Sequence, residues 1–313
     1  MIDISSAISA INWTREPQGL YDPIAYTLAS GGKRLRPTLA LIAAGLYGKE
    51  EKALPAALAL EIFHNFTLLH DDVMDQAPIR RGRETVHVKW DDNTAILSGD
   101  QMLIEAYKQL EGIDAVHLPH VLHLFSKMGT EICEGQQYDM EFETREDVSI
   151  DEYIEMIRLK TSVLLGAALE IGAYIADAPS ADMEALEVFG TNLGLAFQIQ
   201  DDILDVYGDE ATFGKSIGGD ILQNKKSLAL LMALKHANAD QLARLQGWLH
   251  STDYVPQEKI AAVTAIYNEI GVRELCEAEQ NRYTRIAIES LNRMSADAAP
   301  LMKLAEKLNN RAN

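Results

Sequence analysis

Two stretches of this chain place three aspartates on a single helical turn at the end of an apolar run. The first, FTLLHDDVMD, covers residues 66–75, and the second, FQIQDDILD, covers residues 197–205. Residues three or four apart share one face of a helix, so the carboxylates of each stretch lie close together and repel one another. A buried helix accepts such a cluster only when cations neutralise it. Each cluster therefore predicts a helix that holds metal ions on one face.

The six aspartates of these stretches supply oxygen ligands of the kind that a hard ion prefers. They are Asp71, Asp72 and Asp75 in the first cluster, and Asp201, Asp202 and Asp205 in the second. Oxygen donors with no cysteine and one nearby histidine favour Mg²⁺ over Zn²⁺. A single cluster is as readily an exposed acidic helix end, but two facing helices would surround one cavity with carboxylates. Several Mg²⁺ ions in one cavity are typical of a site for a polyphosphate ligand.

Composition limits the compartment and the partners of the chain. With 28 basic and 47 acidic residues, the net charge of −19 argues against nucleic acid or an anionic membrane surface as a general partner. The two cysteines, Cys133 and Cys276, form no metal or disulfide pattern and indicate a reducing compartment. The longest apolar run, residues 39–47, is too short to span a bilayer, and no leader sequence is evident. We expect a soluble, cytoplasmic protein without stable membrane insertion.

Apolar residues recur at helical spacing along most of the chain, and no alternating strand or hairpin pattern is evident. Helices are predicted for residues 38–47, 53–70, 95–110, 118–142, 150–176 and 183–207, with several shorter amphipathic helices in residues 228–308. Residues 78–82 are predicted to form a polar loop, and no Pro-, Gly- or Ser-rich linker divides the chain. The prediction is an all-α protein with a single domain over residues 1–313, in which helices that are apolar on more than one face pack as a bundle.

Basic residues occur in segments that could meet a phosphate ligand. In GGKRLRP, residues 31–37, two glycines allow tight turns and the basic side chains offer donors, although such a segment alone is more often a solvated turn. Arg80 and Arg81 follow the first aspartate cluster after one short loop. Lys160 lies among apolar residues, where a lysine needs an anionic partner. Lys215 lies in a glycine-rich segment that could close over a ligand.

In order and spacing, these segments resemble the trans-isoprenyl diphosphate synthases of the polyprenyl synthetase family. The resemblance is carried by GGKRLRP at 31–37, LHDDVMD at 69–75, RRG at 80–82, KT at 160–161, FQIQDDILD at 197–205, and GK at 214–215 through Asp220 to Lys225. One aspartate motif is weak evidence, whereas the complete ordered set is specific. The resemblance implies a large helical bundle around a deep central cavity, head-to-tail condensation of an allylic prenyl diphosphate with isopentenyl diphosphate, and a homodimer.

The resemblance also implies roles for individual residues. The diphosphate of isopentenyl diphosphate would be bound by Lys33, Arg36, His64 and Arg81. The allylic diphosphate would contact Arg80, Lys160 and Lys215, with Lys225 at a further substrate-binding position. Thr161 and Gln198 would place oxygens near the reacting carbon. Three Mg²⁺ ions per active site, held chiefly by Asp71, Asp75 and Asp201, would help the allylic diphosphate to leave, and the proton lost after coupling would go to that diphosphate.

Other classes of protein share parts of this pattern. Glu61 and His64 form the Glu-x-x-His pair of di-iron bundles, but no second pair occurs on a comparable helix. A class I terpene cyclase would normally carry an Asn/Asp-Ser/Thr-Glu motif in place of the second aspartate motif. A catalytically inactive regulatory subunit would have lost motif carboxylates. A purely structural bundle would leave the buried carboxylates and Lys160 without a reason.

Product length and subunit contact depend on two further helical faces. Phe66, Thr67 and Phe63 lie five, four and eight positions before Asp71. By resemblance, a bulky residue five positions before the motif accompanies short products, so Phe66 is the predicted floor of the product channel. Geranylgeranyl diphosphate is the first choice of product, farnesyl diphosphate the second and a long-chain product the third, because the opposite wall near residues 128–132 cannot be read from one sequence. The predicted dimer contact is the helix 95–110, through Ile96, Leu97, Met102, Leu103, Ile104 and Tyr107.

Overall fold

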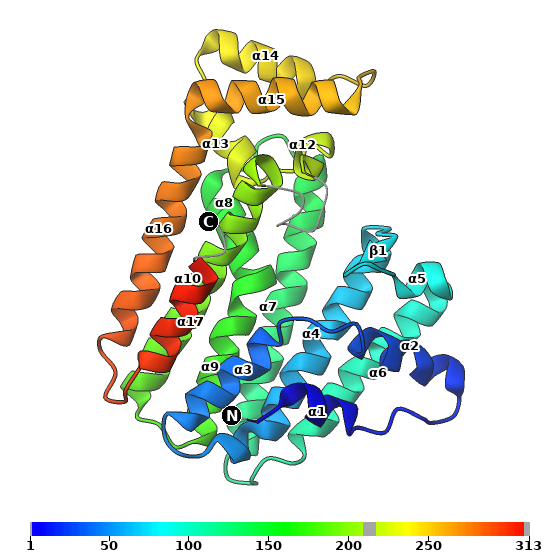
Figure 1. Cartoon of the computed structure of the whole chain (residues 1–313), viewed down its shortest axis with the longest axis vertical. Helices are drawn as coiled ribbons and strands as arrows, with labels where there is room; N and C mark the ends of the chain where they lie inside the picture. Colours follow the sequence, from blue (N-terminus) through cyan, green and yellow to red (C-terminus); the bar gives the residue numbers. More distant parts are fainter. Residues whose placement is uncertain (1, 209–216, 310–313) are drawn as a thin grey trace. The chain divides into compact units, whose positions relative to one another are not determined.

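A computed structural model describes residues 2–208 and 217–309 of the chain, and nearly all of its regular structure is helical (Figure 1). The helices before residue 112 are α1 (Ile4–Ser9), α2 (Gln18–Leu28), α3 (Leu35–Gly45), η1 (Glu50–Ala53), α4 (Leu54–Met74), α5 (Val86–Lys89) and α6 (Asp92–Leu110). Those that follow are α7 (Leu118–Thr144), α8 (Ile150–Ile157), η2 (Arg158–Ser162), α9 (Val163–Ile175), α10 (Ser180–Tyr207), α12 (Gly219–Leu222), α13 (Leu228–His236), α14 (Ala239–Leu249), α15 (Pro256–Ile270), α16 (Val272–Leu291) and α17 (Ala299–Asn309). The all-α prediction is confirmed.

The chain divides into two compact units, and it passes from one to the other within helices α7, α9 and α10 and again around residues 295–297, between α16 and α17. The N-terminal unit comprises Met1–Ser126, Ala167–Leu186 and Ser295–Asp297, and the C-terminal unit comprises Lys127–Gly166, Glu187–Met294 and Ala298–Asn313. The first aspartate motif belongs to the N-terminal unit and the second to the C-terminal unit. That residues 1–313 form one functional domain stays a prediction.

The first aspartate motif ends a helix that is buried on several sides. Helix α4 packs along α6 and against α3, and aliphatic residues such as Leu60 and Ile62 are fully buried. Pro55 occupies its first turn, where the missing N–H needs no partner. The helix continues to Met74, beyond the predicted end at residue 70, so its last turn carries the aspartates.

A short hairpin follows helix α4, where the sequence predicted only a polar loop. Strands β1 (Ile79–Arg80) and β2 (Arg83–Glu84) pair in antiparallel register. The two turn residues, Arg81 and Gly82, both have positive φ, at 53° and 73°. Such a two-residue turn matches the twist of a hairpin and favours glycine. The prediction that residues 78–82 lack a hairpin was wrong, since strands of two residues are too short to show an alternating pattern.

The predicted helix over residues 150–176 is interrupted by the π-helical turn η2, which contains Lys160. Neighbouring helices approach this turn through glycines. A Cβ on Gly135 of α7 would lie 2.3 Å from the Lys160 nitrogen, and a Cβ on Gly194 of α10 would lie 2.7 Å from the Ser162 Cα. Single π turns occur frequently at functional sites. Here the turn determines how Lys160 and Thr161 are presented.

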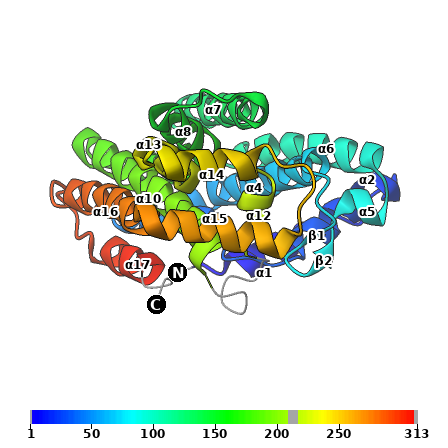
Figure 2. The same ribbon diagram turned by 90° about the horizontal axis from the view of Figure 1, so that it is seen from above.

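The rest of the C-terminal unit packs its helices around a second apolar cluster. This cluster includes Ile203 of α10, Leu228 of α13, Ile266 of α15 and Cys276 of α16. Helices α14 and α15 lie side by side, as Figures 1 and 2 show. Helix α16 has 20 residues and is longer than the short helices predicted for this segment. Among the described residues, no helix is both long and apolar enough to cross a bilayer.

Candidate active site

The first aspartate motif places its three carboxylates in different surroundings. Asp72 is only 6% exposed, and Arg80 Nε donates to its Oδ1 over 2.7 Å. Burial raises the pKa of Asp72, and the charge of Arg80 partly opposes that rise. Asp71 is partly exposed and Asp75 is exposed. These two lie one turn apart on the same helical face, and the negative charge of Asp75 adds to the rise in the pKa of Asp72.

Four arginines surround His64 in the N-terminal unit. Burial lowers the pKa of His64 well below its usual value, and the charges of Arg36, Arg81, Arg80 and Arg34 lower it further. The imidazole is therefore neutral near pH 7 and offers one donor and one acceptor. Burial also lowers the pKa of Arg36 to about 10, and its buried Nε has no hydrogen-bond partner within the described part of the chain. Buried donors without an acceptor are expected where an anion binds.

The glycine loop before α3 lies against Arg81. The φ angles of Gly31 and Gly32 are 72° and 128°, which side chains other than glycine rarely adopt. Arg81 Nη1 donates to the Gly31 carbonyl, and a Cβ on Gly32 would lie 2.8 Å from the Arg81 Cζ. The loop thus requires glycine at position 32 both for its backbone angle and for the close approach of Arg81. Lys33, the next residue, is exposed.

The second aspartate motif, on α10, also contains one strongly buried carboxylate. Asp202 is 6% exposed and accepts from the Tyr153 hydroxyl over 2.5 Å and from the Leu228 N–H over 2.8 Å. Burial chiefly, and then the charge of Asp220, raise the pKa of Asp202 to about 7. Asp201 and Asp205 are partly exposed. The outer residues of the motif again differ from the middle one.

Lys160 has a protein partner that the sequence did not reveal. Its Nζ lies 2.6 Å from Oδ2 of Asp139 on α7. Burial opposes ionisation of Asp139, but the charges of Lys160 and Lys225 outweigh it and lower the pKa of this carboxyl group. Lys160 thus has an anionic partner within the protein, and its contact with a bound diphosphate stays a prediction. No sequence motif marked Asp139, which lies 21 positions before Lys160 on a different helix.

Three other predicted residues of the C-terminal unit can be placed, and one cannot. Thr161 follows Lys160 in the π turn and is partly exposed. Gln198 Nε2 lies 3.5 Å from Oδ1 of Asp202, one turn along α10. Lys225 is exposed. Lys215 lies outside the described residues.

The predicted floor residue of the product channel belongs to a series of aromatic contacts. Phe66 is partly exposed and meets Phe63 edge to face, with ring centroids 5.4 Å apart. Phe63 is buried and meets Phe125 in the same way at 5.3 Å, and Phe125 in turn meets Tyr107 at 5.2 Å. The Thr67 hydroxyl donates to the His64 carbonyl. Phe66 is thus supported from behind by rings that are packed into the core.

The predicted dimer helix exposes only part of its apolar surface. Ile96, Leu97 and Ile104 are 44%, 60% and 54% exposed. Leu103 and Tyr107 are partly exposed. Met102 is fully buried in the core, so its assignment to a subunit contact was wrong. The direction of a single residue on this helix was not evident, because apolar residues occur on more than one of its faces.

Oxygen chemistry in the two motifs fits a Mg²⁺ ion, although the described residues contain no group of three metal-ligating side chains arranged around one point. Mg²⁺ commonly binds one or two carboxylates and completes its octahedron with water and substrate phosphates. Asp71 and Asp75, one turn apart and not fully buried, meet that requirement in the N-terminal unit. Asp201 and Asp205 do so in the C-terminal unit. Asp72 and Asp202 are buried and accept from Arg80 and from Tyr153, and Asp205 accepts from the Asp220 N–H over 3.0 Å.

Comparison with known proteins identifies the family to which the chain belongs. The family model for polyprenyl synthetase matches residues 17–270. The chain is 41% identical over 254 residues to a geranylgeranyl diphosphate synthase of Methanosarcina mazei, an alignment that covers 80% of this chain and 78% of that protein. It is 43% identical over 228 residues to a short chain isoprenyl diphosphate synthase of Methanocaldococcus jannaschii, covering 72% and 69%.

Solved structures of similar proteins share the fold over nearly the whole length. A crystal structure of a geranylgeranyl pyrophosphate synthase superposes with a TM-score of 0.92 at 42% identity, covering 100% of this chain and 99% of that one. A decaprenyl diphosphate synthase from Rhodobacter capsulatus superposes with a TM-score of 0.88 at 28% identity, covering 99% and 95%. From the family match, the sequence identity and the shared fold, we conclude that this chain belongs to the polyprenyl synthetase family.

Proposed function

We propose that this chain is a short-chain prenyltransferase that condenses an allylic prenyl diphosphate with isopentenyl diphosphate, head to tail. The product is an all-trans prenyl diphosphate, with geranylgeranyl diphosphate expected first and farnesyl diphosphate second, and inorganic diphosphate is released. The observation that carries the proposal is the cluster of four arginines around a neutral His64, in the same unit as the first aspartate motif. A diphosphate is the small ligand that such a cluster and adjacent Mg²⁺-binding carboxylates would bind together.

The N-terminal unit would bind the diphosphate of isopentenyl diphosphate through Arg36, Arg81 and His64, with Lys33 at the exposed edge. Arg36 brings a buried nitrogen that has no acceptor among residues 2–208 and 217–309. The low pKa of His64 means that it would donate a hydrogen bond to phosphate as a neutral imidazole and would not add a charge. Binding of this substrate would thus depend on the arginines and Lys33 for charge.

Ionisation of the allylic diphosphate would be assisted by Arg80 and Lys160, which neutralise charge on the leaving group. Mg²⁺, held by Asp71 and Asp75 and by Asp201 and Asp205, would supply Lewis-acid assistance to the same group. The carbon–oxygen bond breaks heterolytically, and the oxygens of Thr161 and Gln198 would stabilise the allylic cation.

In the coupling step, the double bond of isopentenyl diphosphate attacks the cation, and a proton then passes to the departing diphosphate. His64, with its pKa lowered by burial and by its arginine neighbours, is a neutral imidazole that could donate one hydrogen bond to the diphosphate of this substrate.

The reaction is tested by following diphosphate release with an allylic prenyl diphosphate, isopentenyl diphosphate and Mg²⁺. Release should require both substrates and should stop when a chelator removes the metal. Release that needs no isopentenyl diphosphate would instead indicate a terpene cyclase. No release with any allylic diphosphate would leave a non-catalytic bundle and contradict the proposal.

Product length is tested at Phe66. The ring of Phe66 is supported by Phe63 and Phe125, so it should act as a rigid floor, and Phe66→Ala should lengthen the product by one or more five-carbon units. Chromatography of the dephosphorylated products reports the chain length. Thr67→Ala is the comparison, because Thr67 is already small and its hydroxyl donates to the His64 carbonyl, so its loss should change the length less than Phe66→Ala. Equal chain length from Phe66→Ala and the unaltered protein would show that the floor lies elsewhere.

We also propose that the protein is a cytoplasmic homodimer, with no nucleic-acid partner and three Mg²⁺ ions per active site. The exposed side chains of Ile96, Leu97 and Ile104 support a subunit contact on helix α6, since they form an apolar strip on one element. The two unpaired cysteines are consistent with a reducing compartment. Light scattering at micromolar concentration should give the mass of a dimer, and a monomeric mass would remove the proposed contact.

A further inference from the structure

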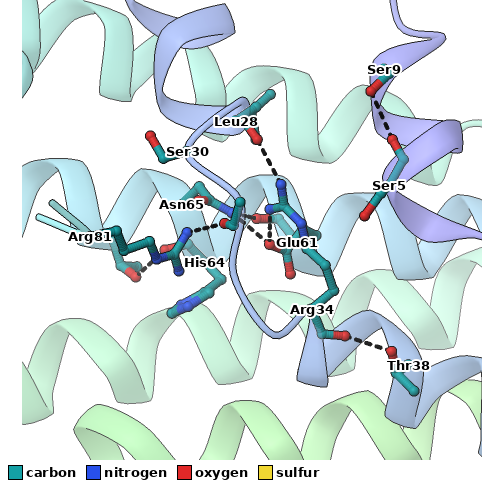
Figure 3. Close-up of polar contacts among 12 residues, drawn as sticks. Ser5, Ser9, Leu28, Ser30, Arg34, Thr38, Glu61, His64, Asn65 and Arg81 are labelled. Atoms are coloured by element: carbon teal, nitrogen blue, oxygen red, sulfur yellow. Dashed lines mark hydrogen bonds and ion pairs between the residues drawn. The ribbon is translucent and has the colours of Figure 1, made fainter. Parts of the chain in front are cut away.

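One carboxylate lies inside the arginine cluster that we assign to an anionic substrate. Glu61, on α4, is 2% exposed, and its Oε1 accepts from Arg34 Nη1 over 2.5 Å (Figure 3). A fixed negative charge in a site for a diphosphate works against binding by simple electrostatics. The position of Glu61 therefore needs a reason other than direct contact with the substrate.

Arg34 connects three helices through groups of its own. Its Nη1 contacts Glu61 on α4, its Nη2 donates to the Leu28 carbonyl at the end of α2 over 2.6 Å, and its own carbonyl accepts from the Thr38 hydroxyl on α3 over 2.7 Å. The side chain of Arg34 is 10% exposed. Although Arg34 stands in the middle of the basic loop, both terminal nitrogens of its guanidinium are thus committed to the protein.

The backbone of Arg34 is held in the left-handed region, with φ at 45° and ψ at 38°. This conformation is unfavourable for a residue with a Cβ and persists where the surroundings hold it. Lys33 precedes Arg34 and Arg36 follows it by two positions, so the left-handed turn determines the directions in which both side chains leave the backbone. The Arg34–Glu61 ion pair is the strongest polar contact holding that turn, because both partners are charged and nearly buried.

Glu61 is itself fixed before any ligand binds. Asn65 Nδ2 donates to the Glu61 carbonyl and to its Oε1, both over 2.8 Å, and Asn65 is 1% exposed. The backbone contact fixes the Asn65 amide, and Oε1 of Glu61 is then held by both Asn65 and Arg34. In Figure 3 the Glu61, Asn65 and Arg34 side chains converge, while Arg81 and His64 lie to one side of them.

We propose that Glu61 is a positioning residue: by holding Arg34, it sets Lys33 and Arg36 in place for the diphosphate of isopentenyl diphosphate. The inference rests on the proposed function of the site. For the affinity of isopentenyl diphosphate, it predicts a change opposite to the one expected from charge alone. Removing a negative charge from an anion site should tighten binding if only electrostatics matters, whereas loss of the anchor should weaken it.

The test compares Glu61→Gln with Glu105→Gln. Glu105 is the matched control, because it is also 2% exposed, is also paired with an arginine (Arg15, 2.9 Å) and lies in the same unit. We expect Glu61→Gln to raise the KM for isopentenyl diphosphate by roughly tenfold or more, the size expected for loss of a charged hydrogen bond. The KM for the allylic diphosphate and the Mg²⁺ concentration at half-saturation should change less than about twofold. Glu105→Gln should change neither KM.

A lowered or unchanged KM for isopentenyl diphosphate in Glu61→Gln would overturn the proposal, and so would an equal rise in Glu105→Gln. A double variant gives a further check. If Glu61 acts through Arg34, then Arg34→Gln combined with Glu61→Gln should bind isopentenyl diphosphate no more weakly than Arg34→Gln alone. If the losses of affinity in the two single variants add up in the double variant, Glu61 does not act through Arg34.

Two measurements separate this inference from the proposed function. Hydrogen exchange of the amides in residues 29–36 should be faster in Glu61→Gln than in Glu105→Gln, and equal protection would contradict the anchoring role. If the unaltered protein does not turn over, the proposed function fails. If it turns over and Glu61→Gln retains its affinity for isopentenyl diphosphate, only the positioning role fails. Should Glu61→Gln not fold, Glu61→Asp keeps the charge but withdraws it from Arg34, and the same selective rise in KM is expected.

Discussion

The two aspartate motifs have the same spacing, yet the two units surround the middle aspartate differently. Asp72 and Asp202 are each 6% exposed. Asp72 faces a guanidinium, that of Arg80, whereas Asp202 faces neutral donors: the Tyr153 hydroxyl, the Leu228 N–H and, more distantly, the Gln198 amide. Burial raises the pKa of both, and for Asp202, with Asp220 nearby, it reaches about 7. Asp72 thus orients the cationic side chain of Arg80. Asp202, on α10, instead connects its helix to α8 and to the start of α13.

The difference teaches that the six aspartates are not six equivalent ligands. In each motif the outer residues are at least partly exposed, and the middle residue is turned into the protein. Metal binding should therefore depend on Asp71, Asp75, Asp201 and Asp205. The middle residues should affect catalysis through the groups that they hold. Graded substitutions can separate these two kinds of effect.

The largest effect is expected from the outer aspartates. Asp71→Ala or Asp201→Ala should lower kcat by about 10³-fold, because a metal ligand that stabilises charge on the leaving group is lost. The fold should remain intact, since removing a carboxylate relieves repulsion within the motif, and circular dichroism checks this. Near-normal turnover in purified Asp71→Ala protein would contradict the assignment of the site.

A smaller effect, and a sharper comparison, is expected from the middle aspartates. Asp72→Asn removes the counter-charge of Arg80, so kcat/KM for the allylic diphosphate should fall by about 10- to 100-fold, as for other partners that orient a binding group. Asp202→Asn keeps an oxygen that can accept from Tyr153 and Leu228, so its loss should be less than about tenfold.

The decisive readout for this pair is a Mg²⁺ titration of activity. Neither middle variant should shift the half-saturating Mg²⁺ concentration, whereas Asp75→Asn, the matched outer variant, should raise it. If Asp72→Asn and Asp75→Asn shift the Mg²⁺ requirement alike, the distinction between outer and middle residues is lost.

The smallest effect on turnover is expected at Tyr153. Tyr153→Phe removes one of the two donors to the buried Oδ2 of Asp202 and should lower the free energy of unfolding by about 1–3 kcal/mol. Its kcat/KM should change less than about tenfold. Tyr47→Phe is the control, because the Tyr47 hydroxyl donates to Asp182 over 2.7 Å outside both motifs. Urea unfolding of both variants measures the loss. A Tyr153→Phe protein of full stability and abolished activity would place Tyr153 in the chemistry instead.

The sequence allowed prediction of the features that depend on local pattern. Helical spacing of apolar residues predicted the all-α fold, and the two aspartate motifs lie on helices α4 and α10 as expected. The hairpin that presents Arg81 was missed, because two-residue strands carry no periodicity. The π turn at Lys160 was missed as well, since it accompanies the close approach of Gly135 and Gly194, which come from other helices.

Partners that are distant in sequence were also beyond prediction. Asp139 neutralises Lys160 and Arg34 pairs with Glu61, and in each case the two residues belong to different elements. Glu61 was noticed only as half of a di-iron pattern, because its distance from the glycine loop is set by the packing of α3 on α4. Such contacts depend on tertiary structure, and their partners have no characteristic separation in the sequence.

Product analysis tests the central claim of prenyl transfer most directly. The protein is incubated with farnesyl diphosphate, isopentenyl diphosphate and Mg²⁺, and the prenyl products and released diphosphate are both quantified. The account predicts geranylgeranyl diphosphate as the main product, with one diphosphate released for each isopentenyl unit consumed. A cyclised hydrocarbon, or diphosphate released without consumption of isopentenyl diphosphate, would contradict it.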